Sequence, residues 1–253
     1  MNPTASIETV HLNGIAMYVE RHGEGTPLLL LHGGGGVGQN WRPIFEAPPQ
    51  GYELIIPDLR GHGQSTNPDG AITFRQLALD VLALMDACRI DRFKAIGLSL
   101  GAKTLLHVAT QQSARVESMV LVSAAPYFPE ATRVLMRAAA TATHDDAEWE
   151  RMRRWHVNGD EQIGSIWDMS RQFADDYEDM SFTPPRLGQI RAKTMVVHGD
   201  RDFLYPVTLA TELHAGIPGS HLWVIPNGGH GPVFGEMAPL FARTALAFLG
   251  EWK

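Results

Sequence analysis

The sequence has 253 residues, of which 44% are hydrophobic, and its formal net charge at pH 7 is -7. A chain of this length can bury a large core, and we expect one α/β domain that carries an insertion. The negative net charge and the scattered basic residues argue against nucleic acid as a partner.

The sequence contains no apolar stretch of the length that a membrane-spanning helix requires, and the first ten residues form neither a basic nor an apolar run. We therefore expect neither export nor contact with a membrane. The single cysteine, Cys88, cannot form an intramolecular disulfide, which fits a reducing compartment. The expected location is the cytoplasm.

The first predicted element is a β-hairpin over residues 7–22. It turns at Asn13-Gly14, a dipeptide that readily adopts the positive φ angles of a tight turn. Six short apolar runs follow, and unbroken apolar runs are typical of strands that are buried on both faces. The runs are residues 28–31, 54–56, 93–96, 119–122, 195–197 and 222–225.

Helical patterns separate several of these strands. In the clearest one, apolar side chains recur at intervals of one, two and three turns between Leu77 and Cys88. Thr73 and Gln76 are placed to form a capping box, in which the hydroxyl and the amide satisfy N–H groups of the first turn. The alternation of strands and helices predicts a mostly parallel sheet with helices on both faces.

One connection is much longer than the others. About seventy residues separate the strands predicted at 119–122 and 195–197, which is too many for a simple loop. The inserted segment is rich in Ala, Met and Arg, which favour helices. We expect a core domain of residues 1–125 and 188–253 and a helical cap of residues 126–187.

A nucleophile is predicted at Ser99. The segment Gly97-Leu98-Ser99-Leu100-Gly101 matches G-x-S-x-G, follows the strand at 93–96 and precedes a helical pattern. In this context the motif forms a sharp turn that lifts the serine out of the sheet, and the two glycines leave the room that the turn requires.

The general base for this serine is predicted after the last strand. His230 lies there in a Gly-Gly-His-Gly turn, at the sheet edge where the ends of parallel strands meet. Asp200 and Asp202 both follow the strand at 195–197, and either carboxylate could orient the imidazole. Without H-E-x-x-H or a comparable ligand cluster, neither a metal nor another cofactor is expected.

Together these features resemble the α/β-hydrolase family, specifically its cap-bearing branch of esterases, lactonases and carbon–carbon bond hydrolases. The resemblance covers nearly the whole chain and implies a mostly parallel sheet of the eight-stranded type. Besides the serine motif, it rests on LLLLHGGGGVGQNW at 28–41, PDLRGHGQS at 57–65, HGDRDFLYP at 198–206 and NGGHGPVFGE at 227–236.

The resemblance also implies roles for individual residues. It favours Asp202 as the catalytic acid, because Asp202 stands three residues after a glycine and a few before a proline, as the family's acid does. It implies that the backbone N–H groups of Gly34 and Leu100 form the oxyanion hole. Asp58 is expected to brace a loop.

The expected reaction is hydrolysis of a small-molecule carboxylic ester or lactone through an acyl-enzyme. A serine at position 99 argues against haloalkane dehalogenases and epoxide hydrolases, which resemble this fold but carry an aspartate there. Carbon–carbon bond hydrolases, amidases, perhydrolases and hydroxynitrile lyases stay open, as does a non-catalytic ligand receptor. The oligomeric state, monomer or homodimer, also stays open.

Aromatic residues are expected to bound the substrate pocket. The set comprises three tryptophans of the insertion and one phenylalanine after the strand at 195–197, and most other apolar residues of the insertion are expected to hold it onto the core. Arg151, Arg153 and Arg154 are expected to form a solvated helix face. His156 is expected to be a surface or packing residue. The predicted pocket residues are Trp149, Trp155, Trp167 and Phe203.

Overall fold

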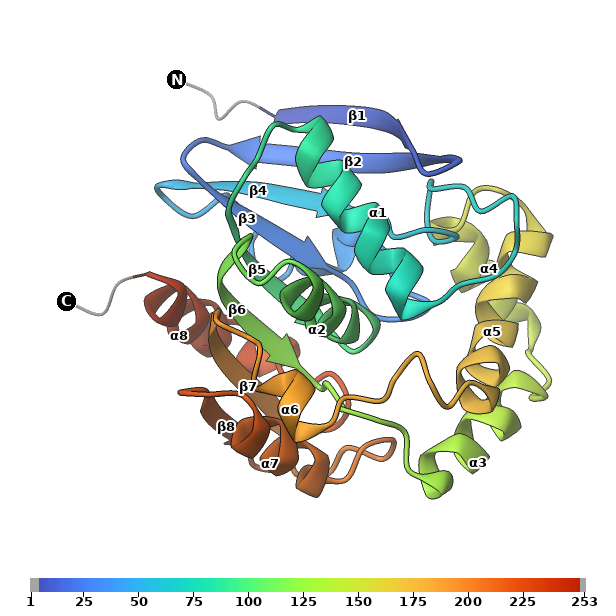
Figure 1. Cartoon of the computed structure of the whole chain (residues 1–253). Coiled ribbons are helices and arrows are strands. Elements are labelled where there is room, and N and C mark those ends of the chain that lie inside the picture. Colours follow the sequence, from blue (N-terminus) through green and yellow to red (C-terminus); the bar gives the residue numbers. More distant parts are fainter. Residues whose placement is uncertain (1–4, 251–253) are drawn as a thin grey trace.

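The computed structural model describes residues 5–250, in which eight strands form one sheet in the order β1-β2-β4-β3-β5-β6-β7-β8. Helices cover both faces of this sheet (Figure 1). The predicted hairpin and all six predicted strands are confirmed, as is the α/β fold class. The strands are β1 (Ala5–Leu12), β2 (Ile15–Gly23), β3 (Thr26–Leu31), β4 (Tyr52–Pro57), β5 (Phe93–Leu98), β6 (Val116–Val122), β7 (Lys193–Gly199) and β8 (His221–Ile225).

The direction of the strands follows from their connections. Strands β1 and β2 are antiparallel and join through Asn13 and Gly14, whose φ angles of 43° and 77° are those of a tight turn. Strand β2 is also antiparallel to β4, whereas all pairings from β4 to β8 are parallel. Parallel neighbours require crossover helices, which explains the helical segments between them.

Successive side chains of a strand point to opposite faces of the sheet, so the core has two layers. On β3, Leu29 and Leu31 pack into the layer with α1, α2 and α7, whereas Leu28 and Leu30 pack into the layer with α8. All four leucines are fully buried, as their unbroken apolar run predicts. The helices are α1 (Phe74–Ala87), α2 (Leu100–Gln111), α7 (Val207–Gly216) and α8 (Ala238–Leu249).

Helix α1 begins at the predicted cap, but only half of the capping box forms. The Thr73 side chain accepts a hydrogen bond from the Gln76 N–H at 3.0 Å. The Gln76 amide donates instead to Asp80 Oδ1 at 2.9 Å. Asp80 is buried and also binds Arg60, so this stronger acceptor draws the amide away from the helix end.

The long connection between β6 and β7 forms a separate group of helices beyond the ends of the strands, on the right in Figure 1. Its helices are α3 (Glu130–Ala140), α4 (Asp146–Trp155) and α5 (Asp160–Asp175), and the short α6 (Pro184–Leu187) follows where the chain rejoins the sheet layers. A bridge between Tyr127 and Ser181 joins the outgoing and returning chain. We call this helical group, α3 to α5, the cap.

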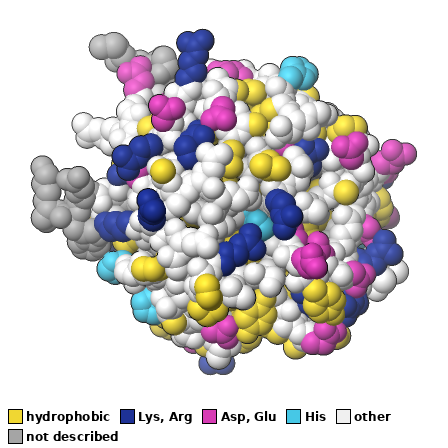
Figure 2. All heavy atoms as spheres, in the orientation of Figure 1, with side chains coloured by type: hydrophobic (Ala, Val, Ile, Leu, Met, Phe, Trp, Pro, Cys, Tyr) yellow, Lys and Arg dark blue, Asp and Glu magenta, His cyan; other side chains and the backbone are white. Residues whose placement is uncertain are grey.

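The surface mixes charges of both signs. Figure 2 shows basic and acidic side chains interspersed on one face, with hydrophobic side chains gathered where α3 lies. Val134 and Leu135 of that helix are exposed. None of the helices within residues 5–250 has the length and apolar character needed to cross a membrane.

Candidate active site

The turn between β5 and α2 holds Ser99 in a strained conformation. The φ angle of Ser99 is 47°, and its N–H donates to the Val122 carbonyl oxygen at 2.8 Å. A Cβ on Gly97 would lie 2.6 Å from the carbonyl carbon of Gly101, and one on Gly101 would lie 2.5 Å from the Leu31 carbonyl oxygen. Both glycines are therefore required for the backbone to pass this closely, as the motif predicts.

This crowding gives a stability prediction. Gly101→Ala is expected to lower the free energy of unfolding by about 1–3 kcal/mol, because backbone atoms cannot yield to the new methyl group. Gly164→Ala is the control, since an exposed glycine in α5 with no atom within 4 Å of its added Cβ should gain about 0.5–1 kcal/mol. Urea unfolding measures both, and equal stabilities would contradict the crowding argument.

The three residues predicted to form the triad lie in one hydrogen-bonded chain. His230 Nε2 is 2.9 Å from Ser99 Oγ, and His230 Nδ1 is 2.8 Å from Asp202 Oδ2. Strands β7 and β8 pair Gly199 with Ile225, which brings the loops that carry Asp202 and His230 together. A carboxylate can only accept, so Nδ1 carries the proton and Nε2 is free to accept the serine proton.

The structure distinguishes between Asp200 and Asp202, either of which could orient the imidazole according to the sequence. Asp200 is exposed, whereas the Asp202 side chain is fully buried. Burial by itself would raise the pKa of the Asp202 carboxyl, but the hydrogen bond and charge of His230 and two backbone N–H groups hold it below its usual value. Those N–H groups, from Leu204 and Tyr205, donate to Oδ1 at 2.9 and 3.0 Å. Asp202 is thus kept ionised and fixed toward the imidazole.

The two predicted oxyanion donors flank the nucleophile. The register of β3 and β5 pairs Leu31 with Gly97, so the glycine-rich loop after β3 lies beside the serine turn. Gly34 and Leu100 both line the cavity that contains Ser99. Within residues 5–250 neither of their N–H groups has a hydrogen-bond acceptor. Both donors are available for a developing oxyanion.

Buried polar side chains hold the glycine-rich loop in place. His32 Nδ1 donates to the Gly33 carbonyl oxygen at 2.8 Å, and its Nε2 accepts the Leu59 N–H at 2.9 Å. Asp58 accepts the Gly38 and Gln64 N–H groups, at 2.8 and 2.9 Å. Asp58 therefore braces two loops, the role that the resemblance implies for it.

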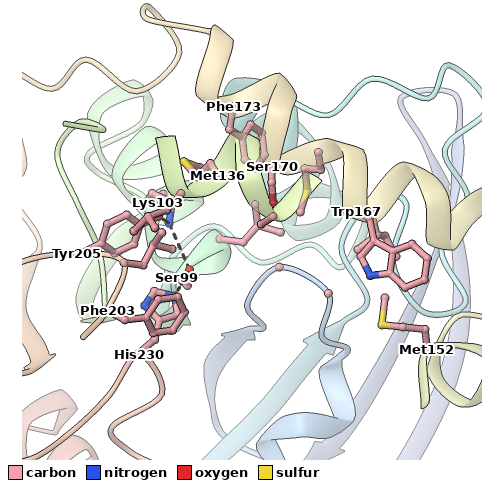
Figure 3. A pocket seen from close by; sticks show the side chains of 18 of the residues that line it. Ser99, Lys103, Met136, Met152, Trp167, Ser170, Phe173, Phe203, Tyr205 and His230 are labelled. Carbon is pink, nitrogen blue, oxygen red and sulfur yellow. Dashed lines mark hydrogen bonds between the residues drawn. The ribbon is translucent and has the colours of Figure 1, made fainter. Parts of the chain in front are cut away.

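A cavity of about 620 Å³ opens above Ser99 between the sheet and the cap (Figure 3). Apolar side chains of α3 and α5 form its roof, and Figure 3 shows Met136, Ser170 and Phe173 above the serine, with Trp167 and Met152 farther away. The other lining residues are Gly34, Gly35, Phe74, Ser99, Leu100, Lys103, Leu135, Ala139, His144, Glu148, Arg151, Ile166, Met169, Phe203, Leu204, Tyr205 and His230.

Two of the four aromatic pocket predictions are placed elsewhere by the structure. Trp167 and Phe203 line the cavity, and Phe203 is 75% exposed at its rim. Trp149 and Trp155 are not among the lining residues. Trp149 packs edge-on behind Trp167, with ring centroids 4.5 Å apart, and Trp155 lies half-exposed at the end of α4. Arg151, expected to face solvent, is exposed but also lines the cavity.

Three further residues contact the site, and the sequence did not predict that they belong to it. Ser123 Oγ donates to the His230 carbonyl oxygen at 2.7 Å, which fixes the loop of the base. His156 is buried at the end of α4, where it accepts the Gly63 N–H and donates to the Gly35 carbonyl oxygen. Lys103 Nζ lies 3.4 Å from Ser99 Oγ. The signal for the third was a lysine in the first turn of a mostly apolar helix, four residues after the serine of G-x-S-x-G.

No group of three or more His, Cys, Asp or Glu side chains in the described part of the chain is arranged to hold a metal ion. The polar groups that the structure brings together around Ser99 are the His230 imidazole, the Asp202 carboxylate and the Lys103 ammonium group.

Comparison with known proteins agrees with this fold. A family model described as the alpha/beta hydrolase fold matches residues 26–155. The putative carbamate hydrolase RutD of Variovorax paradoxus (strain S110) is 30% identical, over 93% of this chain and 96% of its own. A 2-hydroxy-6-oxo-6-phenylhexa-2,4-dienoate hydrolase of Comamonas testosteroni is 27% identical over 98% and 96%. The enol-lactonase from Burkholderia xenovorans LB400 has the same fold, with a TM-score of 0.76 at 24% identity over 96% of this chain and 100% of its own.

Proposed function

The chain belongs to the α/β-hydrolase family, and on that premise we propose that it is a serine hydrolase that cleaves a carboxylic ester or a lactone. One observation carries the proposal: a hydrogen-bonded chain runs from Asp202 through His230 to Ser99 at the base of a mostly apolar cavity. Such a cavity accepts the apolar part of an ester, and the free N–H groups face the carbonyl.

The chemistry follows from the proton positions. His230 Nε2 accepts the Ser99 proton while Oγ attacks the substrate carbonyl carbon, and the N–H groups of Gly34 and Leu100 bind the resulting oxyanion. The imidazolium then gives its proton to the leaving alkoxide, or to the ring oxygen of a lactone. Water, activated by the same imidazole, releases the acyl group and regenerates Ser99.

A second candidate is hydrolysis of a carbon–carbon bond. It is favoured by the Comamonas testosteroni relative, which aligns over 98% of this chain and is named for an oxo-dienoate substrate. The same triad and oxyanion donors can serve both reactions. The two candidates therefore have to be distinguished by the substrate that the pocket accepts.

The test is a substrate panel. p-Nitrophenyl esters of increasing acyl length, a simple lactone, a p-nitrophenyl carbamate and an oxo-dienoate are offered to the wild type at matched protein concentration. Saturable turnover of esters or lactones supports the proposal. Turnover of the oxo-dienoate alone would replace it with the second candidate, and a ligand bound tightly and recovered unchanged would indicate a receptor.

The roof of the cavity gives a prediction about chain length. Met136 of α3 is buried and lines the cavity, so Met136→Trp is expected to shift the preferred acyl chain to a shorter one and to lower kcat/KM for long esters about 10-fold or more. Val134→Trp on the exposed side of the same helix is the matched control. An unchanged preference in Met136→Trp would remove α3 from the acyl site.

A further inference from the structure

A buried lysine lies against the nucleophile, and the triad chemistry does not use it. Lys103 is on the first turn of α2 and only 2% exposed. Its Nζ donates to Tyr205 Oη at 3.0 Å and lies 3.4 Å from Ser99 Oγ (Figure 3). Lys103 also lines the cavity that contains Ser99.

The surroundings of Lys103 favour its charged form against the cost of burial. Nζ lies 5.5, 5.6 and 4.8 Å from the ring centroids of Phe74, Phe128 and Tyr205, within the range of cation–π attraction. Burial raises the pKa of the Tyr205 phenol, so its oxygen stays in the neutral hydroxyl that accepts from Nζ. The lysine is thus held in place by three rings and a hydroxyl.

We propose that Lys103 is a further catalytic residue, whose ammonium group donates a hydrogen bond to Ser99 Oγ and stabilises the negative charge that develops there. The inference rests on the proposed serine chemistry and adds a second group that contacts the reacting oxygen. A donor aimed at developing charge in a site with little water is worth far more than the same donor in solvent.

Lys103 contributes charge and no proton to this step. The Ser99 proton moves to His230 Nε2, the Oγ electron pair forms the bond to the carbonyl carbon, and the carbonyl π electrons move to its oxygen. Lys103 keeps its three protons throughout. When the acyl-enzyme is hydrolysed, Oγ becomes the leaving group and the same hydrogen bond stabilises its departure.

The charges around Lys103 define its pH behaviour. Asp202, in the loop after β7, acts through space to raise the pKa of Lys103. Behind the rings, Arg133 lies 5.7 Å from the Phe128 centroid, and burial lowers the pKa of His107 to about 4. On the far side of the Phe74 ring, the Asp179 carboxylate accepts the Phe74 N–H and lies 3.8 Å from His107 Nε2.

The sign of the pH dependence follows. Burial lowers the pKa of Lys103 to about 7 against the opposing effect of Asp202. As the pH rises through that region, the ammonium becomes an amine and its stabilisation of Oγ is lost. The wild type is therefore expected to lose activity on the alkaline side of its pH profile, as Lys103 loses its charge.

Burial of Lys103 also lowers the stability of the folded protein, so Lys103→Met is expected to fold and can be tested. Between the folded pKa of about 7 and the ordinary value, the unfolded chain holds more protons than the folded chain, so stability rises with pH. Lys103→Met removes this cost. Its melting temperature is expected to exceed that of the wild type at pH 7 and below, and the difference should shrink toward pH 10.

The test measures the reactivity of Ser99 without knowledge of the substrate. An alkyl fluorophosphonate labels wild type, Lys103→Met and Lys103→Gln from pH 5 to 10, and p-nitrophenyl ester turnover is followed in parallel. Lys94→Met, on β5 at the opposite end from Ser99, is the matched control. We expect Lys103→Met and Lys103→Gln to be labelled about 10- to 100-fold more slowly near neutral pH and to lack the alkaline fall.

Each result decides the inference. A Lys103→Met protein labelled as fast as wild type, or slowed equally at every pH, overturns it, because a structural role would leave the profile unchanged. A wild type whose labelling rises through the pH range where Lys103 deprotonates overturns the ammonium role in favour of a neutral base. Wild-type labelling without ester turnover refutes only the proposed substrate, and absence of any labelling refutes both.

Discussion

Ser99→Ala is expected to abolish hydrolysis, lowering kcat by about 10⁴- to 10⁶-fold on the best ester of the panel. The alanine removes the atom that attacks the carbonyl, and no other hydroxyl occupies its place in the hydrogen bond to His230. His230→Ala should cause a loss of similar size, because the two residues act as a unit. Chromophore release at matched concentration measures both, together with loss of fluorophosphonate labelling.

Ser170→Ala is the control for this result. Ser170 is a second serine that lines the same cavity, on α5 of the cap, and Figure 3 shows it well above Ser99. Its removal should change KM more than kcat, within about 10-fold, since it lies outside the hydrogen-bonded chain. Retained activity in Ser99→Ala, or an equal loss in Ser170→Ala, would remove Ser99 from the mechanism.

The sequence was sufficient for the sheet because its central strands are buried on both faces. Residues 28–31, which follow Pro27 and are separated from Gly33 by one residue, form a short unbroken apolar run. Such a run is typical of a strand inside a parallel sheet. The serine turn was equally readable, since G-x-S-x-G requires residues without a side chain, and a Cβ added to Gly97 or Gly101 would lie less than 3 Å from backbone atoms. Each of these signals lies within a short segment of the sequence, so it can be recognised without knowing which distant segments the residues contact.

The pocket was less readable because it depends on how the cap is turned. An amphipathic helix shows which of its residues are apolar, but not which neighbour they meet. Trp149 and Trp155 both lie on α4, yet one supports Trp167 from behind and the other stays at the surface. Trp167, on α5, reaches the cavity. The orientation of a cap relative to the core is a tertiary property that periodicity does not contain.

Polar residues that act across the fold were missed for a related reason. His156 contacts Gly35 and Gly63, which are more than ninety positions away in the sequence. Lys103 could have been noticed, because a charge among Leu, Ala and Val after the serine motif breaks the apolar face of α2. The partners that make this lysine a participant, Tyr205 and the aromatic rings, come from other segments and required the structure.

Asp202→Asn is expected to lower kcat by about 10⁴-fold while leaving the fold intact. The Leu204 and Tyr205 N–H groups donate to Oδ1, so the asparagine must place its carbonyl oxygen there and its NH₂ toward His230 Nδ1. Nδ1 then has to accept, the imidazole proton moves to Nε2, and the base can no longer take the serine proton.

The matched control for that change is Asp200→Asn, which alters the same residue type two positions away. Asp200 is exposed and has no hydrogen bond to His230 within the described residues, so near-wild-type turnover is expected. Ester kinetics with melting temperatures for both variants decide between them. A large loss in Asp200→Asn with Asp202→Asn active would reverse the assignment. Equal small losses would mean that His230 is held well enough by Ser123 and its loop to act without a fixed tautomer.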